Sequence, residues 1–193
     1  LDCSIPYIGS DHQKIGRTAA GYLQNALPAG SKVGVVAGFQ GQQSLAARTD
    51  AFRTALATDS RLQLLRVEPS CLSFASALDA ARSLIEDGAD ALFCTSAVLG
   101  LGAAAAVRET DAAVRIVAVD TQDDALKAVE TGAFDALITQ SGEEIGRRTI
   151  ETVAAALRGK TPPGETYIAG EVLTADNIAE FLSKEGEETW SVS

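Results

Sequence analysis

Short apolar runs and longer amphipathic segments alternate along most of this chain. The apolar runs, which we predict to be strands, are residues 32–37, 62–67, 89–94, 115–119 and 135–139, with shorter ones at 166–169 and 172–173. In the segments between them, apolar residues recur every three to four positions, as expected for helices that bury one face. Strands that alternate with helices in this way predict an α/β fold, in which a doubly wound, mostly parallel sheet carries helices on both faces.

Capping signals suggest where several of these helices begin and end. Ser10 and Gln13 have the spacing of a capping box, so we expect the first helix to be capped by Ser10. A later helix is expected over residues 73–87, and another is expected to open at Ser141. The residues from Lys184 to the end are rich in acidic side chains, and we expect them to fray.

Two polar side chains follow two of the predicted strands. Asp120 comes directly after the strand at 115–119, and Gln140 comes directly after the strand at 135–139. In open α/β sheets, ligands bind in the crevice beyond the carboxyl ends of the strands. A carboxylate accepts hydrogen bonds from hydroxyl groups, and an amide both donates and accepts, so the pair suits a polyol. A turn or a helix cap explains Asp120 equally well.

Charge and hydropathy exclude two classes of partner. The chain has 193 residues and a formal net charge of −10, with no basic run. Such a charge disfavours nucleic acid, whose binding depends on neutralising phosphates. We therefore expect no nucleic acid to bind through this segment. No uncharged apolar run is long enough to span a membrane.

The residues give little support to catalysis. His12 is the only histidine, and a surface position near the helix cap explains it better than a general base does. No nucleophile-elbow, zinc-protease or Cys-x-x-Cys motif is present, and the Gly38–Gly41 loop lacks both phosphate-binding fingerprints. Cys3, Cys71 and Cys94 lack metal-ligand spacing, and Cys94 reads as a small core hydrophobe. We predict that the chain is not an enzyme and needs no cofactor or metal.

Several motifs in sequence order resemble one known family. They are Tyr7-Ile8-Gly9-Ser10-Asp11, Gly38-Phe39-Gln40-Gly41, Ala47-Arg48-Thr49-Asp50-Ala51-Phe52, Val117-Ala118-Val119-Asp120 and Gln140 through Gly146. Together they look like the type I periplasmic sugar-binding proteins of the ribose-binding type. The ending from Val172 to Phe181 is similar to that of transporter-associated members, whereas lactose-repressor-type regulators share the core but usually end differently.

The resemblance implies two Rossmann-like or flavodoxin-like lobes, joined by three crossovers, with a sugar held between them. Asp120 and Gln140 match the Asp and Gln that bond sugar hydroxyls in the family. Ser96 stands where an Asn is usual, Leu72 where ribose binders have a stacking aromatic, and Ala46 where an arginine grips the ring oxygens. We take these five as candidate ligand-binding residues, and the last two departures weaken the case for a pentose.

Arg48, two residues after Ala46, resembles a structural arginine of the family rather than the sugar-binding one. The chain also contains no methionine, so Leu1 is not a translation start, and we expect a processed or trimmed product of a longer protein. Family members carry roughly a hundred further residues before the Ser10-Asp11 motif, which form most of an N-terminal lobe.

The resemblance then divides the chain into four parts. Residues 1–10 would cross from the missing N-terminal lobe, and residues 11–140 would form the C-terminal, ligand-binding lobe. Residues 141–163 would be a helix that packs on the missing lobe, and residues 164–193 a return strand, a final helix and an acidic tail.

The helix in the third part has an apolar stripe that needs a cover. Ile145, Ile150, Val153 and Leu157 lie along one side of it. A bare stripe of this kind favours association. We expect it to pack on an N-terminal lobe, on a second copy of the chain, or on the chain's own sheet.

These features predict the solute-binding component of an ABC-type importer, which binds a sugar or polyol and delivers it to a membrane permease. The protein would then be a periplasmic or extracellular lipoprotein. The alternative is the effector-binding domain of a lactose-repressor-type regulator, which would be cytoplasmic. A third reading, a flavodoxin-like enzyme, needs a cofactor loop that the sequence lacks.

Overall fold

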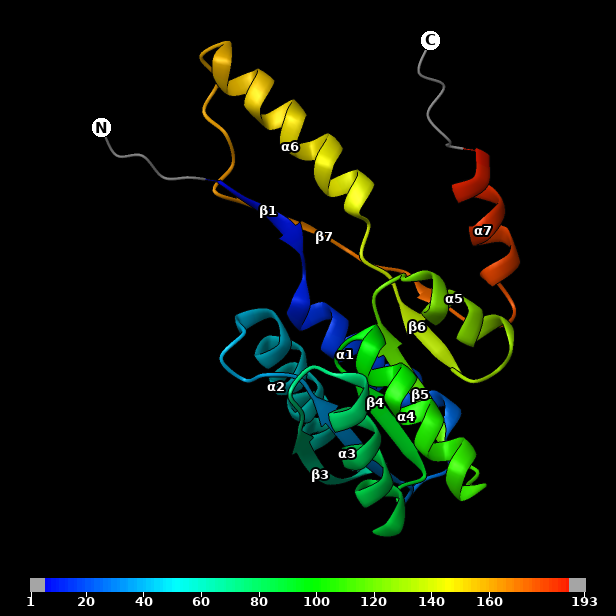
Figure 1. Cartoon of the computed structure of the whole chain (residues 1–193). Coiled ribbons are helices and arrows are strands. Elements are labelled where there is room, and N and C mark those ends of the chain that lie inside the picture. Colours follow the sequence, from blue (N-terminus) through cyan, green and yellow to red (C-terminus); the bar gives the residue numbers. More distant parts are fainter. Residues whose placement is uncertain (1–5, 188–193) are drawn as a thin grey trace.

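The computed structural model describes residues 6–187, in which strands and helices alternate (Figure 1). The strands are β1 (Tyr7–Ser10), β2 (Lys32–Ala37), β3 (Gln63–Pro69), β4 (Ala91–Cys94), β5 (Arg115–Val119), β6 (Ala136–Ile138), β7 (Glu165–Ile168) and β8 (Val172–Leu173). The helices are α1 (His12–Ala26), α2 (Gln43–Thr58), α3 (Phe74–Glu86), α4 (Ala97–Thr110), α5 (Asp123–Glu130), α6 (Gly142–Leu157) and α7 (Ile178–Glu187).

Six strands form the main sheet, in the order β3-β2-β4-β5-β6-β8. The pairs among the first five are parallel, and only β8 runs antiparallel to its neighbour β6. After β3 the chain crosses to the other side of β2 to form β4, so the direction of winding reverses between β2 and β4. Ligands in such sheets bind near this reversal. The predicted doubly wound, mostly parallel α/β fold is confirmed.

Alternation along the strands explains why both faces of this sheet are covered. In β5, Val117 and Val119 belong to a buried cluster with side chains of α1 and α2. Ile116 and Ala118 point the other way, into a cluster with α3, α4, α5 and α7. Side chains at successive positions of a strand lie on opposite faces, so a continuous apolar run makes a strand that is buried on both sides.

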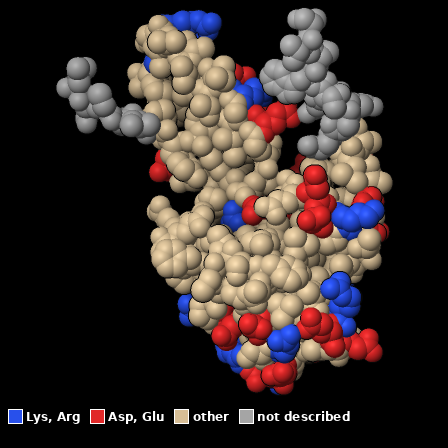
Figure 2. All heavy atoms as spheres, in the orientation of Figure 1, with Lys and Arg blue, Asp and Glu red and all other residues tan. Residues whose placement is uncertain are grey.

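A second, two-stranded sheet stands apart from the main one. It consists of β1 and β7, which pair in parallel, and α6 lies beside β1 (Figure 1). The chain passes between this small unit and the main sheet three times, at residues 10–11, 139–142 and 169–171. The space-filling view is hollowed between the two parts (Figure 2).

Backbone hydrogen bonds tie the three crossings to one another. The amide of Asp11 donates to the carbonyl of Ile168 at 3.2 Å, and the amide of Thr139 donates to the carbonyl of Glu171 at 2.9 Å. Gly170 lies so close to the Thr139 carbonyl that a Cβ there would collide with it. The crossings therefore run side by side, as a narrow bundle between the two parts.

Helix α6 buries none of its residues. Ile150, Val153 and Leu157 are 70%, 50% and 84% exposed, and we call these three side chains the α6 stripe. Ile145, which we predicted to share this stripe, is half-buried. The helix projects beyond the main sheet instead of covering it (Figure 1). The side of the molecule around α6 seen in Figure 2 is largely free of charged side chains.

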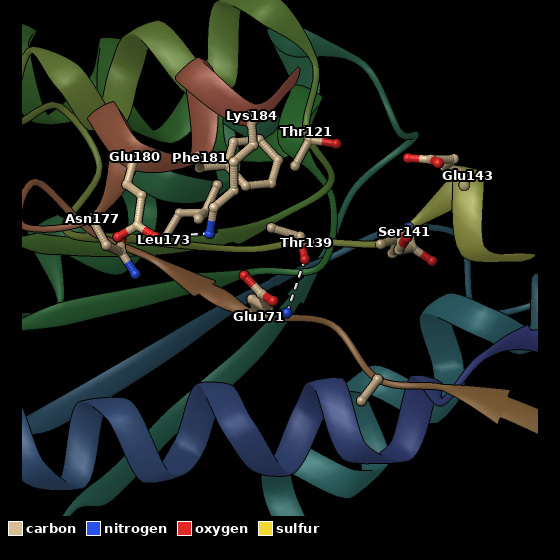
Figure 3. A pocket seen from close by; sticks show the side chains of 13 residues that line it. Thr121, Thr139, Ser141, Glu143, Glu171, Leu173, Asn177, Glu180, Phe181 and Lys184 are labelled. Carbon is tan, nitrogen blue, oxygen red and sulfur yellow. Dashed lines mark hydrogen bonds and ion pairs between the residues drawn. The ribbon is translucent and has the colours of Figure 1, made fainter. Parts of the chain in front are cut away.

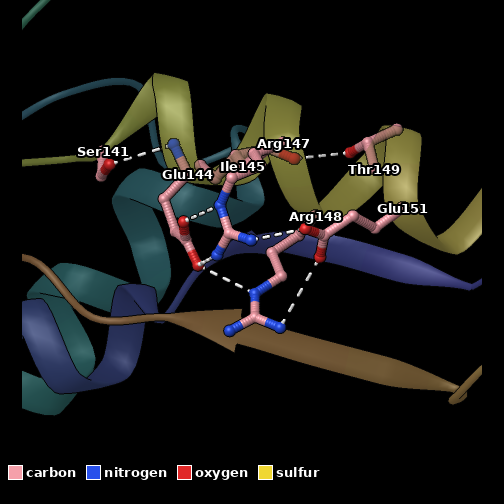
Figure 4. A network of polar contacts seen from close by, with 7 residues as sticks. All are labelled: Ser141, Glu144, Ile145, Arg147, Arg148, Thr149 and Glu151. Atoms are coloured by element: carbon pink, nitrogen blue, oxygen red, sulfur yellow. Dashed lines mark hydrogen bonds and ion pairs between the residues drawn. The ribbon is translucent and has the colours of Figure 1, made fainter.

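Another side of α6 carries a compact ion-pair network (Figure 4). Arg147 donates to both carboxylate oxygens of Glu144, at 2.6 and 2.8 Å. Arg148 donates to the same Glu144 at 2.8 Å, and Glu151 pairs with both arginines. Spacings of three and four residues bring these side chains together on a helix. These ion pairs are therefore formed entirely between side chains of α6.

Two predicted boundaries were wrong. The side chain of Asp11, not of Ser10, caps α1 by accepting from the amide of Lys14 at 2.8 Å. Ser10 is instead a buried member of β1. At the other end, α7 continues to Glu187, so the tail that we expected to fray from Lys184 is helical at its start. The rest of that tail lies outside the described residues.

One of the two cysteines in the described part is buried and the other is exposed. Cys94 is fully buried in the core, as predicted, and burial raises the pKa of its thiol, which makes it unreactive. Cys71 is exposed, and Cys3 lies outside the described residues.

Within residues 6–187, no group of three or more His, Cys, Asp or Glu side chains could hold a metal ion. No helix in that range is long and apolar enough to cross a membrane.

Candidate ligand-binding cleft

A cavity of about 350 Å³ opens at the carboxyl ends of the parallel strands, and we call it the cleft. This volume lies within the usual range for small-molecule sites. The loops that follow β2, β3, β4, β5 and β6 all contribute to its wall. It is lined by His12, Gln42, Ser44, Leu45, Arg48, Leu72, Ser96, Val98, Asp120, Gln122 and Gln140.

The structure brings Asp120 and Gln140 into direct contact. The amide of Asp120 donates to the carbonyl of Ile138 at 3.0 Å, which extends the pairing of β5 with β6 beyond the strands. This bond sets the two side chains next to each other, and Nε2 of Gln140 donates to Oδ1 of Asp120. The second carboxylate oxygen, Oδ2, has no hydrogen bond in the described part of the chain and remains available as an acceptor.

Arg48 forms the floor of the cleft. Its side chain is almost fully buried, and its Nη2 lies 3.7 Å from Oδ1 of Asp120. Its Nη1 donates to the carbonyl of Thr95, at the end of β4, at 2.7 Å. Burial lowers the pKa of Arg48 and Asp120 raises it, but an arginine stays charged in either case. The cation of Arg48 and the anion of Asp120 therefore offset each other, and the pair is neutral overall.

Two further residues of the cleft have unsatisfied or strained groups. Ser96 is only 7% exposed, and its buried hydroxyl has no hydrogen-bond partner. Asp120 and Leu72 have φ angles of 86° and 54°, in the left-handed region that disfavours residues other than glycine. Strained backbone and unpaired buried polar groups concentrate at functional sites. Both features therefore make this cleft the candidate functional site.

Three helices point their N-termini at the cleft without a side-chain cap. Gln42, Ser96 and Gln122 are the N-cap residues of α2, α4 and α5, and none of them makes a capping hydrogen bond. By contrast, the side chains of Asp11 and Ser141 cap α1 and α6. Free amides and the positive end of the helix dipole favour oxygen acceptors. The cleft thus presents donors to a ligand from three directions.

The structure does not bring Ala46 to the cleft. This residue lines a separate groove of about 740 Å³ along the outer side of α2, together with Ala47, Ala51 and Ala55. The other four candidate residues, Asp120, Gln140, Ser96 and Leu72, all line the cleft.

A different cavity, of about 390 Å³, is bordered by the second and third crossings, β8 and α7 (Figure 3). Gln140 lines both this cavity and the cleft. Its charged lining comes from Glu143, Glu171 and a pair formed by Glu180 and Lys184 at 2.8 Å. It lies next to β8 and α7, away from the reversal of winding between β2 and β4. We therefore place the candidate site in the cleft.

Sequence reasoning did not place Arg48 and His12 among the candidate ligand-binding residues. We interpreted Arg48 as structural and His12 as a surface residue, yet both line the cleft and they contact each other. The signal available for His12 was its position at the start of α1, directly after the first crossing. Arg48 lies in the second turn of α2, where no local signal distinguished it. Gln42 and Gln122 were missed as well, and each stands at the N-terminus of a helix that follows a parallel strand.

Comparison with known proteins identifies the family of this chain. A family model described as a periplasmic binding protein domain matches residues 3–161. The ribose import binding protein of Haemophilus influenzae is 28% identical over 158 residues, which are 81% of this chain and 54% of that protein. The D-allose-binding periplasmic protein of Escherichia coli is 24% identical over 180 residues, which are 91% of this chain and 55% of that protein.

The fold also matches known structures. AraP, an arabinose-binding protein from Geobacillus stearothermophilus, superposes with a TM-score of 0.87 at 24% identity, over 91% of this chain and 65% of AraP. The match covers the α/β architecture described above. The chain spans about half the length of the relatives it matches in sequence.

Proposed function

The chain belongs to the family of periplasmic binding protein domains, and from that premise we propose that it is part of a solute-binding protein that holds a sugar or similar polyhydroxylated molecule between two lobes. The names of two relatives, for ribose and for D-allose, support this ligand class. The observation that carries the proposal is the Asp120–Gln140 pair, with the free Oδ2 of Asp120, beside the unpartnered hydroxyl of Ser96.

An uncharged ligand fits the electrostatics of the cleft. Arg48 and Asp120 offset each other, so a charged ligand would leave a net charge buried at the floor. Oδ2 of Asp120 accepts from a hydroxyl group, while Gln140, Ser96 and the uncapped helix amides offer donors and acceptors. A hydroxyl group both donates and accepts, and a polyol therefore satisfies such a set without excess charge.

The three crossings support a mechanism of lobe closure. They are few, adjacent and hydrogen-bonded to one another, so small backbone rotations there move the two parts of the molecule as units. A ligand that contacts both lobes stabilises the closed state by its difference in affinity for the two states. No bond of the ligand is made or broken in this process.

We propose the following division of the chain. Residues 1–10 cross from an N-terminal lobe, residues 11–140 form the C-terminal lobe, residues 141–163 hold the helix that packs on the N-terminal lobe, and residues 164–193 return to the C-terminal lobe. The bare α6 stripe supports this division, because burying three such side chains would stabilise the assembly by several kcal/mol, at ~1.5–3 each. A second copy of the chain is the competing cover for the stripe.

We further propose that the full-length protein is a periplasmic or extracellular lipoprotein that delivers its ligand to the permease of an ABC-type importer. The relative from Haemophilus influenzae, which is named as an import binding protein, supports this context.

A thermal-shift panel on the full-length protein tests the proposed function. The panel contains D-ribose, D-allose, arabinose and myo-inositol, with glutamate and phosphate as charged controls. A ligand at 100 times its dissociation constant stabilises the protein by about 2.7 kcal/mol, which is a clear rise in melting temperature. We expect at least one neutral compound to give this rise and neither charged control to do so. A panel without any response from the neutral compounds would overturn the proposal.

A further inference from the structure

His12 occupies the junction between the cleft and a second cavity. It is the first residue of α1, immediately after the first crossing, and it is half-buried. The second cavity has a volume of about 600 Å³ and is bordered by His12, Ser44 and by Tyr7 and Tyr167 of the two-stranded sheet. His12 and Ser44 line both cavities. The imidazole therefore stands where a ligand would meet both parts of the molecule.

A hydrogen bond with Arg48 fixes where the proton of the imidazole lies. Nε of Arg48 donates to Nδ1 of His12 at 3.4 Å. Because an arginine has no acceptor, Nδ1 must be unprotonated, and a neutral ring then carries its proton on Nε2. Nε2 has no hydrogen-bond partner among residues 6–187. A donor without a partner is thus left at the junction of the two cavities.

The surrounding charges keep this ring neutral near pH 7. Burial lowers the pKa of His12, and the cation of Arg48 on α2 lowers it further. The carboxylates of Asp120, after β5, and of Asp11, at the start of α1, oppose these two effects without cancelling them. The tautomer set by Arg48 is therefore the populated form.

We propose that His12 is a specificity-determining residue of the cleft, whose Nε2–H donates a hydrogen bond to an oxygen of the bound sugar or polyol while Arg48 holds the ring in the required tautomer. This proposal rests on the proposed function of the cleft. The group that meets His12 must be an acceptor, such as a hydroxyl or a ring oxygen. An ammonium group at that place would face a donor and leave both groups unsatisfied.

Nitrogen NMR tests the tautomer directly and without a ligand. This chain contributes a single histidine. The full-length protein is labelled with ¹⁵N-histidine and purified without a histidine tag. The signal that disappears in its His12→Gln variant belongs to His12. We expect a neutral ring protonated at Nε2 at pH 7.5. On saturation with the sugar that raises the melting temperature most, the Nε2 signal should shift more than the Nδ1 signal. A ring protonated at Nδ1 would overturn the proposal.

Binding measurements on variants test the role of the donor. His12→Leu removes it, and we expect an affinity loss of about tenfold, the value of one hydrogen bond at its upper range. His12→Gln supplies an amide donor at a similar reach, and its affinity should stay within about threefold of the wild type. Lys14→Leu, an exposed position in the same turn of α1 that does not line the cleft, is the matched control and should bind like the wild type.

The outcomes separate the two proposals. If a sugar binds the wild type and His12→Leu binds it equally well, the role of His12 is wrong and the proposed function stands. If none of D-ribose, D-allose, arabinose and myo-inositol binds the wild type, the proposed function fails, and the role of His12 fails with it. A tenfold loss in His12→Leu that His12→Gln restores supports both.

Discussion

Helices α4 and α6 have similar lengths, 14 and 16 residues, but opposite surroundings. Helix α4 lies on the main sheet and buries seven positions, all of them alanine, glycine or leucine. Helix α6 buries none, although its sequence is amphipathic and its Ile150, Val153 and Leu157 lie on one side. A largely apolar helix is thus buried in one place, whereas the apolar side of an amphipathic helix is exposed in the other. The apolar stripe of α6 is therefore left uncovered by the residues that the structure describes in this chain.

The polar side of α6 strengthens this comparison. Hydrogen bonds from Arg147 and then Arg148 lower the pKa of the Glu144 carboxyl, so this ion-pair network holds across the neutral range. Such exposed pairs contribute little to stability. Isolated helices of this length are marginal in water, and tertiary packing supplies most of their stability. The apolar side of α6 thus remains the part of the helix that calls for a partner.

The largest expected effect is in the core of the main sheet. Phe93 on β4 is fully buried and stacks on Phe52 with 4.5 Å between ring centroids. Phe93→Ala should lower the free energy of unfolding by about 3–5 kcal/mol, because it removes apolar contacts and leaves a cavity. Urea denaturation of the chain measures this. Leu157→Ala on α6 is the contrasting variant and should change the same quantity by less than about 0.5 kcal/mol.

The next largest effect concerns the stability of the full-length protein, and it tests whether an N-terminal lobe covers the α6 stripe. In the full-length protein we expect Ile150→Ala and Leu157→Ala each to cost about 2–5 kcal/mol, because an N-terminal lobe would bury both side chains. Denaturation of the full-length variants provides the measurement, with Arg158→Ala as an exposed control at the end of the helix. Costs as small as in the chain alone would show that no lobe covers the stripe.

A smaller effect concerns ligand affinity. Asp120→Asn removes the anion that faces Arg48 and one strong acceptor. We expect about a 10- to 100-fold loss of affinity for the bound sugar, since a hydrogen bond to a charged group contributes about 1.5–3 kcal/mol. Isothermal titration calorimetry measures the change. Asp123→Asn, an exposed position in the first turn of α5 that does not line the cleft, should bind as the wild type does. Equal affinities in Asp120→Asn and wild type would remove Asp120 from the site.

The smallest effect is the pH dependence contributed by His12. Its pKa in the folded protein is lowered below the ordinary value of 6.5, so the unfolded chain takes up a proton first as pH falls. The stability linked to His12 is therefore complete above about pH 6.5 and is lost as pH falls through the lowered pKa. His12→Gln should lose less stability than the wild type between pH 7.5 and 5.5 in urea denaturation, at ~0.1 M salt in both. An unchanged or larger loss would contradict the lowered pKa.

Most of the fold could be predicted from the sequence, because a strand that is buried on both faces appears as a continuous apolar run. The strand from Arg115 to Val119 is found as predicted, with its last four residues buried. Helix boundaries were harder to predict where two neighbouring residues can both cap the helix. Ser10 and Asp11 both accept hydrogen bonds from helix amides, and the pairing of Ser10 with β7 decides between them. That pairing depends on a segment more than a hundred residues away in the chain.

The candidate site was only partly accessible for a related reason. Asp120 and Gln140 could be proposed because each directly follows a strand, and parallel strands end at one edge. Arg48 and Ala46 are two positions apart on α2, which places them roughly 200° apart around the helix. Only the rotation of α2 about its own axis decides which of them faces the cleft. The packing of Phe52 and Leu56 into the core sets that rotation, and no local pattern reveals it.

Amide hydrogen exchange of the full-length protein, with and without the sugar that stabilises it most, tests whether the ligand binds in the cleft. We expect slower exchange at residues 95–98, 120–123 and 139–142, which border the cleft, and no change along the outer groove of α2 near Ala46. Unchanged exchange in all three segments at saturating sugar would show that the cleft is not where the ligand binds.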